Sequence, residues 1–135
     1  MTAVSTSTKK PSYKITVDGQ ELTAPVRVTE LEERKESIDY EYECDDIKKI
    51  TIELLNKGDN DTKVVDDKIV EDLLLIISRL AVDQLDLMDR LSKISVYRDH
   101  NNQVHRTHAY ITFNGTMTIK IHKNVLYNNW LSTFV

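Results

Sequence analysis

Apolar and polar residues alternate in short runs along most of the chain. Alternation places apolar side chains on one face of a strand and polar side chains on the other, so each run predicts a half-buried β-strand. The predicted strands cover residues 13–17, 26–31, 38–44, 50–55, 93–97, 104–113 and 116–122. Many short strands separated by turns are typical of antiparallel all-β folds such as sandwiches and jelly rolls.

Turn residues separate these predicted strands. Asp18-Gly19 and Asn114-Gly115 each supply a glycine for the positive φ that a tight hairpin turn needs, so both predict hairpins. Asp66-Asp67, in the polar loop after residues 50–55, is compatible with a smaller hairpin. The charged cluster at residues 30–36 predicts a solvated loop or turn.

Residues 70–91 fit two different periodicities. Apolar positions recur at a spacing that suits a helix over residues 67–91, but several of them also alternate as in a strand. Short apolar runs do not distinguish the two by period alone. Because the neighbouring segments are strand-rich, we predict a strand over residues 73–82 and a short helical turn over residues 85–91.

A chain of 135 residues supports one domain with a sizeable core. Residues 1–12 are small, polar and basic, and predict a flexible N-terminal arm. Residues 13–135 are predicted to form a single all-β domain, an antiparallel β-sandwich of jelly-roll type. Its end, around Trp130, is predicted to be a short helix or an ordered tail.

Composition excludes several classes of protein. The net charge of −4 argues against a nucleic-acid binder, which needs clustered lysines and arginines. No apolar run approaches the roughly 18 residues of a membrane span, and the N-terminus lacks the apolar core of a signal peptide. The single cysteine, Cys44, excludes an internal disulfide and is expected to be a small buried hydrophobe.

The sequence also lacks the motifs of common enzymes. No serine lies in a nucleophile elbow, and three glycines do not make a phosphate-binding loop. We therefore expect a protein that is not an enzyme.

An acidic loop between the predicted strands is a candidate metal site. Calcium takes six to eight oxygen ligands, and the loop offers carboxylate and amide oxygens. If the loop folds back on itself, the ligands would be Asn56, Asp59, Asp61 and Asp72. The spacing is not that of an EF-hand, and a solvated acidic turn is the alternative interpretation.

Histidines cluster around the predicted hairpin at Asn114-Gly115. A two-residue turn would place His105 and His122 on one face, whereas a three-residue loop would pair His108 with His122. We favour the three-residue loop because it also aligns the apolar residues of both strands. The pair is expected to be a cross-strand polar contact rather than a metal site, which needs three or four ligands.

Three aromatic residues are candidate binding residues. Side chains of this kind stack on sugar rings or anchor a partner subunit when they are exposed. The candidates are Tyr97, Tyr127 and Trp130.

Two segments resemble known protein families. ITIELLNKGDNDTKVVDDKIVEDLLLIISRLAVDQLDL, with its order of strand, acidic loop and apolar strand, resembles calcium-dependent xylan-binding β-sandwich modules. HAYITFNGTMTIKIHKNVLYNNWL is similar to the closing strands of small virion proteins of marine tailed phages, which share this sandwich. The resemblance implies a sandwich with acidic loops that ligate calcium near a sugar site.

The resemblance also implies a function. We expect a non-enzymatic virion structural protein, such as a decoration, tail or adaptor subunit, made in the host cytoplasm. Its partners would be other virion proteins or further copies of itself. The alternatives are a calcium-dependent carbohydrate-binding module that binds a glycan, or a small acidic inhibitor or immunity-type protein.

Overall fold

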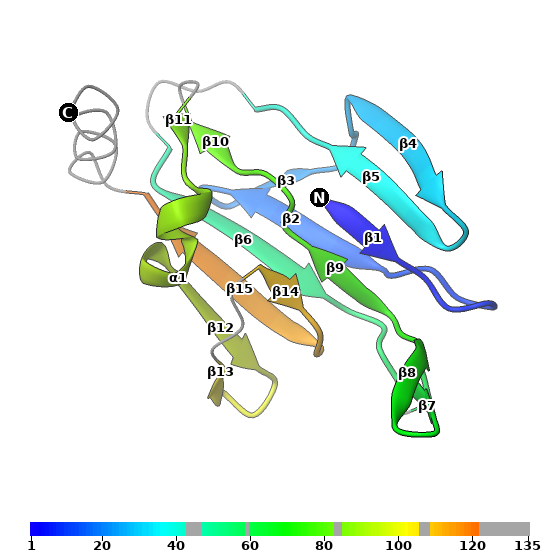
Figure 1. Ribbon diagram of the computed structural model, residues 1–135. Helices are drawn as coiled ribbons and strands as arrows, with labels where there is room; N and C mark the ends of the chain where they lie inside the picture. The colour runs from blue at the N-terminus through cyan, green and yellow to red at the C-terminus, as the bar shows by residue number, and fades with distance from the viewer. Residues whose placement is uncertain (43–46, 59, 83–84, 106–108, 122–135) are drawn as a thin grey trace.

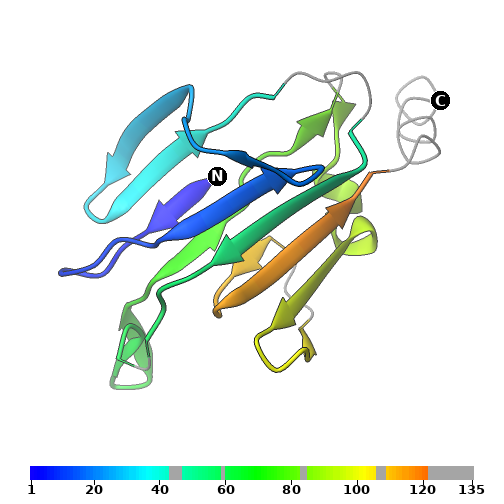
Figure 2. The same ribbon diagram turned by 180° about the vertical axis from the view of Figure 1, so that it is seen from behind.

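The computed structural model describes residues 1–42, 47–58, 60–82, 85–105 and 109–121. It is an all-β protein in which two antiparallel sheets face each other across an apolar core, as Figures 1 and 2 show from opposite sides. The predicted fold class is therefore confirmed. The helix or tail predicted at the C-terminus lies outside the described residues.

The two sheets contain five and six strands. The five-stranded sheet has the order β14 (Tyr110–Ile111), β9 (Leu74–Ile76), β1 (Thr2–Val4), β5 (Lys35–Asp39), β4 (Arg27–Glu32). The six-stranded sheet has the order β13 (Val104–His105), β12 (Ser95–Asp99), β15 (Gly115–Lys120), β6 (Lys49–Leu54), β2 (Tyr13–Val17), β3 (Gln20–Leu22).

Smaller elements connect or extend these sheets. Two hairpins are formed by β7 (Lys63–Val65) with β8 (Lys68–Glu71) and by β10 (Ala81–Val82) with β11 (Leu85–Asp86). A 3₁₀ turn, η1 (Met88–Arg90), leads into the short helix α1 (Leu91–Ile94), close to the short helical turn predicted from the sequence. The strand predicted over residues 73–82 is divided into β9 and β10, which belong to different sheets, and the alternative long helix is wrong.

The core lies where the inward faces of the two sheets meet. Alternation along β6 and β15 points Leu54, Met117 and Ile119 inward, and each is fully buried. Leu75 on β9 and Ile111 on β14 close the core from the other sheet, also fully buried. The polar residues between them face outward, as the alternating pattern predicted.

The prediction of a flexible N-terminal arm is wrong for residues 2–4. They form β1, the middle strand of the five-stranded sheet, hydrogen-bonded to β5 on one side and β9 on the other. Ala3 is 5% exposed, and the terminal amino group donates a hydrogen bond of 3.0 Å to the Ile38 carbonyl. No local pattern indicated this strand, because backbone pairing on both edges, rather than an apolar pattern, holds it in place.

The predicted hairpin turns have different outcomes. Asp18-Gly19 joins β2 to β3, and Asp66-Asp67 joins β7 to β8, so both of these are confirmed. The prediction of a hairpin at Asn114-Gly115 is wrong. There the chain crosses between the sheets, since β14 pairs with β9 whereas β15 pairs with β12 and β6. Gly115 is needed because a Cβ atom at this position would overlap the carbonyl oxygen of Arg98.

Further strand boundaries differ from the prediction, and the strand predicted over 93–97 begins at Ser95 because Lys93 and Ile94 belong to α1. Of residues 30–36, predicted as a loop or turn, the turn is confirmed at residues 33–34, where Arg34 has a φ of 67°, but β4 and β5 extend through the others. The strand predicted over 38–44 ends earlier, at Asp39, and Cys44 lies outside the described residues. The strand predicted over 104–113 is divided into β13 and β14, which belong to different sheets.

Candidate functional site

The hairpin β7–β8 projects from the sandwich, as Figure 1 shows at the lower right. Every residue from 63 to 70 is exposed, although the hairpin is rich in aliphatic side chains. Its large aliphatic residues are Val64 (59% exposed), Val65 (55%), Ile69 (63%) and Val70 (53%). A two-stranded ribbon is marginally stable in water, and exposed apolar clusters of this kind mark interaction sites.

The tip of this hairpin carries two acidic side chains. Asp66 and Asp67 have φ angles of 51° and 62°, the left-handed conformation at both central residues that defines a two-residue type I′ turn. Aspartate tolerates this conformation better than most residues. The turn therefore presents two carboxylates to solvent at the outermost point of the hairpin.

Ion pairs hold the base of the hairpin. Glu71, at the end of β8, lies 2.7 Å from Arg34 Nη1 in the β4–β5 turn and 3.1 Å from Lys63 Nζ on β7. Hydrogen bonds from Lys63 and then Ser7 lower the pKa of Glu71 below its ordinary value. Because this carboxylate contacts two other segments, it fixes the direction in which the hairpin points.

Asp72 forms a second anchor beside Glu71. Its Oδ1 accepts hydrogen bonds from Lys57 Nζ (2.7 Å), Thr62 Oγ1 (2.7 Å) and the Leu73 backbone N–H (2.8 Å). Lys57 is itself fixed, because its backbone N–H and C=O both bond to the Asn114 side-chain amide. The hairpin therefore begins and ends on a rigid polar base.

A second exposed apolar feature is the edge strand β4. All six of its residues are exposed, and among the described strands β4 pairs on one side only, with β5. Val28 lies opposite the buried Ile38 and so faces the core side of the sheet, yet it is 53% exposed. Leu31, at a β-bulge, is 55% exposed. An unpaired edge with uncovered aliphatic residues is a template for pairing with another chain.

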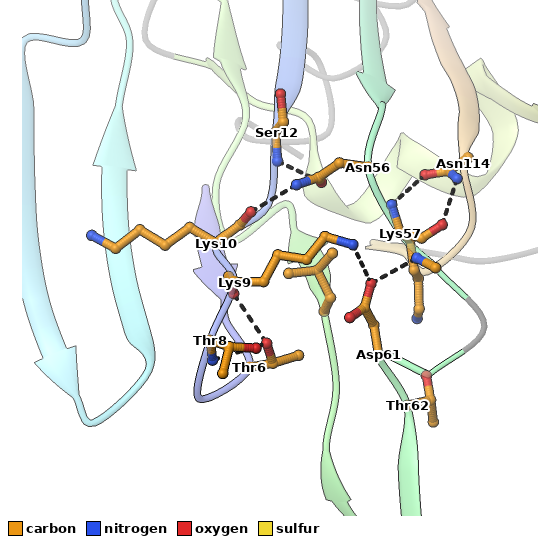
Figure 3. A network of polar contacts seen from close by, with 12 residues as sticks. Thr6, Thr8, Lys9, Lys10, Ser12, Asn56, Lys57, Asp61, Thr62 and Asn114 are labelled. Atoms are coloured by element: carbon orange, nitrogen blue, oxygen red, sulfur yellow. Dashed lines mark hydrogen bonds and ion pairs between the residues drawn. The ribbon is translucent and has the colours of Figure 1, made fainter.

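The loop predicted to bind calcium has other partners. Asn56 accepts a hydrogen bond from the Ser12 N–H (2.7 Å) and donates one to the Lys10 carbonyl (2.9 Å). Asp61 accepts hydrogen bonds from Lys9 Nζ (2.6 Å) and the Gly58 N–H (2.6 Å). Figure 3 shows that these contacts join the loop to the N-terminal segment.

These partners change the chemistry expected of the loop. The hydrogen bond from Lys9 is the main cause of a lowered Asp61 pKa, and Lys57 neutralises Asp72. Among the described residues, no group of three or more His, Cys, Asp or Glu side chains could hold a metal ion. Asn56, Asp61 and Asp72 thus join separate segments of the protein, and Asp59 lies outside the described residues.

The prediction that Tyr97 is an exposed binding residue is wrong. Tyr97 occupies an inward position of β12, is 2% exposed, and exchanges hydrogen bonds with the backbone C=O and N–H of Phe113. Burial raises the pKa of its hydroxyl to about 12. The other two predicted aromatic residues, Tyr127 and Trp130, lie outside the described residues.

Of the three histidines in the predicted pairs, His105 is the one that the structure describes. His105 lies on β13 and contacts Asp99, with 2.8 Å between Nε2 and Oδ2. This contact is the main cause of a lowered Asp99 pKa. His108 and His122 lie outside the described residues, and the hairpin on which their pairing depended does not exist.

The exposure of the β7–β8 hairpin was the feature that sequence reasoning missed. The sequence predicted the turn at Asp66-Asp67. Its signal for an exposed apolar surface was the two aliphatic pairs that flank this turn, Val64-Val65 and Ile69-Val70, whose other neighbours in sequence are polar.

Comparisons with known proteins find no matching family, no matching curated sequence and no matching solved structure. In the described part of the chain, no helix is long and apolar enough to cross a membrane.

Proposed function

We propose that this protein is a non-enzymatic structural subunit that acts through protein–protein contacts, as a decoration, tail or adaptor component of a virion. The observation that carries the proposal is the β7–β8 hairpin, a projecting ribbon with four exposed aliphatic side chains on a rigid base. The virion setting rests on the resemblance of residues 108–131 to closing strands of phage virion proteins.

Burial on a partner would stabilise such a hairpin. Fully burying one aliphatic side chain contributes about 1.5–3 kcal/mol, so covering four that are more than half exposed is a substantial driving force. The rigid base matters because a hairpin already held in its bound direction loses less conformational entropy on association. The edge strand β4 offers a second contact through backbone pairing.

The experiment is to measure incorporation of the chain into particles assembled in cells that carry the complete phage genome. Quantitative mass spectrometry of purified particles should find the wild-type chain at a fixed copy number. A variant with Val64→Thr and Ile69→Thr should fold normally but be depleted from the particles, because its hairpin has lost apolar contact area.

A matched control is Val104→Thr, which changes an equally exposed aliphatic residue (56% exposed) on the distant strand β13. The control variant should be incorporated like the wild type. Absence of the wild-type chain from purified particles would overturn the virion proposal. Equal incorporation of the hairpin variant and the control would show that the hairpin does not mediate incorporation into the particle.

A further inference from the structure

A basic groove lies at the other side of the molecule from the hairpin. It has a volume of about 480 Å³ and lies between η1 and α1 and the outer face of β12 and β15. Beside Thr118, four cationic side chains and two apolar ones line it: Arg90, Lys93, Arg98, Lys120, Ile94 and Val96. None of the described residues that line it is acidic.

The chain folds so as to gather these cations. Arg98 and Val96 alternate with the buried Tyr97 on β12, so both point outward. Lys120 has the same relation to the buried Ile119 on the neighbouring strand β15, and Lys93 is exposed on α1. In the described part of the chain, none of the four cations forms an ion pair with an acidic side chain.

Such a groove is unusual in a chain with a net charge of −4. Four neighbouring positive charges repel one another, and an anionic partner relieves that repulsion. The exposed apolar side chain of Val96 (40% exposed) and the half-buried Ile94 add a surface for an apolar partner. The groove therefore suits a segment that is both acidic and aliphatic.

The tip of the β7–β8 hairpin has that chemistry. Asp66 and Asp67 form the turn, and Lys68 is the only cation between residues 64 and 70, so this tip is net negative. Val65 and Ile69 flank the turn and are 55% and 63% exposed. If the two carboxylates of the turn faced the cations of the groove, the aliphatic side chains that flank the turn would lie over Val96 and Ile94.

The hairpin does not reach the groove of its own chain. Figures 1 and 2 place β7–β8 and the end of the molecule with α1 and β12 on opposite sides. A contact between surfaces on opposite sides joins copies head to tail, and repetition of such a contact gives a ring or a filament.

We propose that the β7–β8 hairpin of one copy binds in the basic groove of the next copy, so that the chain assembles head to tail. The inference rests on the proposed function, because it names the partner of the hairpin as a second copy of this chain. Ion pairs set the register of the contact, and the aliphatic residues contribute burial.

The test uses light scattering of the purified full chain across a wide range of concentration. The wild type should grow in mass with concentration, and the mass should fall as salt is added, because salt screens exposed charges. Replacing Asp66→Asn together with Asp67→Gly gives the turn the Asn-Gly pair that type I′ turns prefer and removes both tip charges. This tip variant should be monomeric although its hairpin is at least as well formed.

A groove variant, Lys93→Glu with Lys120→Glu, should also be monomeric. A one-to-one mixture of the tip and groove variants should give dimers that grow no further, because only one working tip and one working groove can meet. A control variant, Lys14→Glu with Lys48→Glu, makes the same charge change at two exposed lysines that do not line the groove, and it should assemble like the wild type.

A wild-type chain that stays monomeric at every concentration would overturn the head-to-tail contact, as would a mixture that forms no dimers. A tip variant that reaches the same mass as the wild type at the same concentration would also overturn it. These outcomes are distinct from failure of the proposed function, which is decided by whether particles contain the chain. A chain present in particles but monomeric in solution would leave the function standing and the head-to-tail contact refuted.

Discussion

The sandwich core and the β7–β8 hairpin use aliphatic strand residues for opposite purposes. In the core, Leu54 and Ile119 lie between two sheets and are fully buried. In the hairpin, Val64 and Ile69 form a cross-strand pair that is about three-fifths exposed. Both regions place aliphatic residues on strands. They differ in whether a second sheet covers those residues: a covered residue stabilises the fold, and an uncovered one is available to a partner.

The two regions also differ in what fixes their position. The core strands are held by long ladders, such as the pairing of β15 with β6 over six residues. The hairpin is fixed to the rest of the protein by Glu71 and Asp72, whose partners outside the hairpin lie in the β4–β5 turn and the loop after β6. Side-chain ion pairs and hydrogen bonds thus fix the position of the hairpin, whereas backbone ladders fix the core strands.

The largest expected effect comes from truncating matched aliphatic residues in the two regions. Leu75→Ala, on β9 of the five-stranded sheet, should lower the free energy of unfolding by about 2–5 kcal/mol, because it leaves a cavity in a fully buried site. Ile69→Ala, in the hairpin, should change it by about 0.5 kcal/mol or less. Urea denaturation of both variants measures the difference, and equal losses would contradict the comparison.

A smaller loss is expected from Gly115→Ala at the start of β15. The added Cβ would overlap the Arg98 carbonyl, so β12 and β15 must shift apart, at a cost of about 1–3 kcal/mol. Thermal denaturation measures this loss, with Thr116→Ala on the same strand as the control. A Gly115→Ala variant as stable as wild type would show that the close approach of these strands is not required.

The smallest expected effect is the response of the hairpin base to acid. Because the pKa of Glu71 is lowered in the folded protein, its contribution is complete above its ordinary value of 4.5 and is lost as pH falls through the lowered pKa. The melting temperature should therefore decrease as the pH is lowered from 4.5. Glu71→Gln should be less stable at neutral pH and lose less on acidification, whereas an unchanged acid response would show that Glu71 is not coupled to folding.

Much of the fold could be predicted from local pattern. The alternation of residues 13–17 and 50–55 predicted β2 and β6, and the turns at Asp18-Gly19 and Asp66-Asp67 occur where the residue types require them. Each of these depends on neighbours in sequence. Pairing partners do not, which is why the continuous alternation of residues 104–113 gave no sign that the chain changes sheets within it.

The candidate site shows the same division. The sequence offered Asp61 and Asp72 as calcium ligands that would converge if the loop folded back, and the structure gives each a lysine partner, Lys9 for one and Lys57 for the other. Lys9 lies 52 residues from Asp61 in the chain, so no local pattern could have indicated the contact. The basic groove was missed for the same reason, since its cations come from η1, α1, β12 and β15.

By itself, then, the sequence determined that this chain forms antiparallel strands with one apolar face each, because alternation and turn chemistry act between near neighbours. Only the tertiary structure decided that Thr2–Val4 would become a central strand and that Tyr97 would be buried. It alone left the aliphatic faces of β7 and β8 without a second sheet. Those outcomes depend on which distant segments come to lie side by side, and burial is a property of that arrangement rather than of any residue alone.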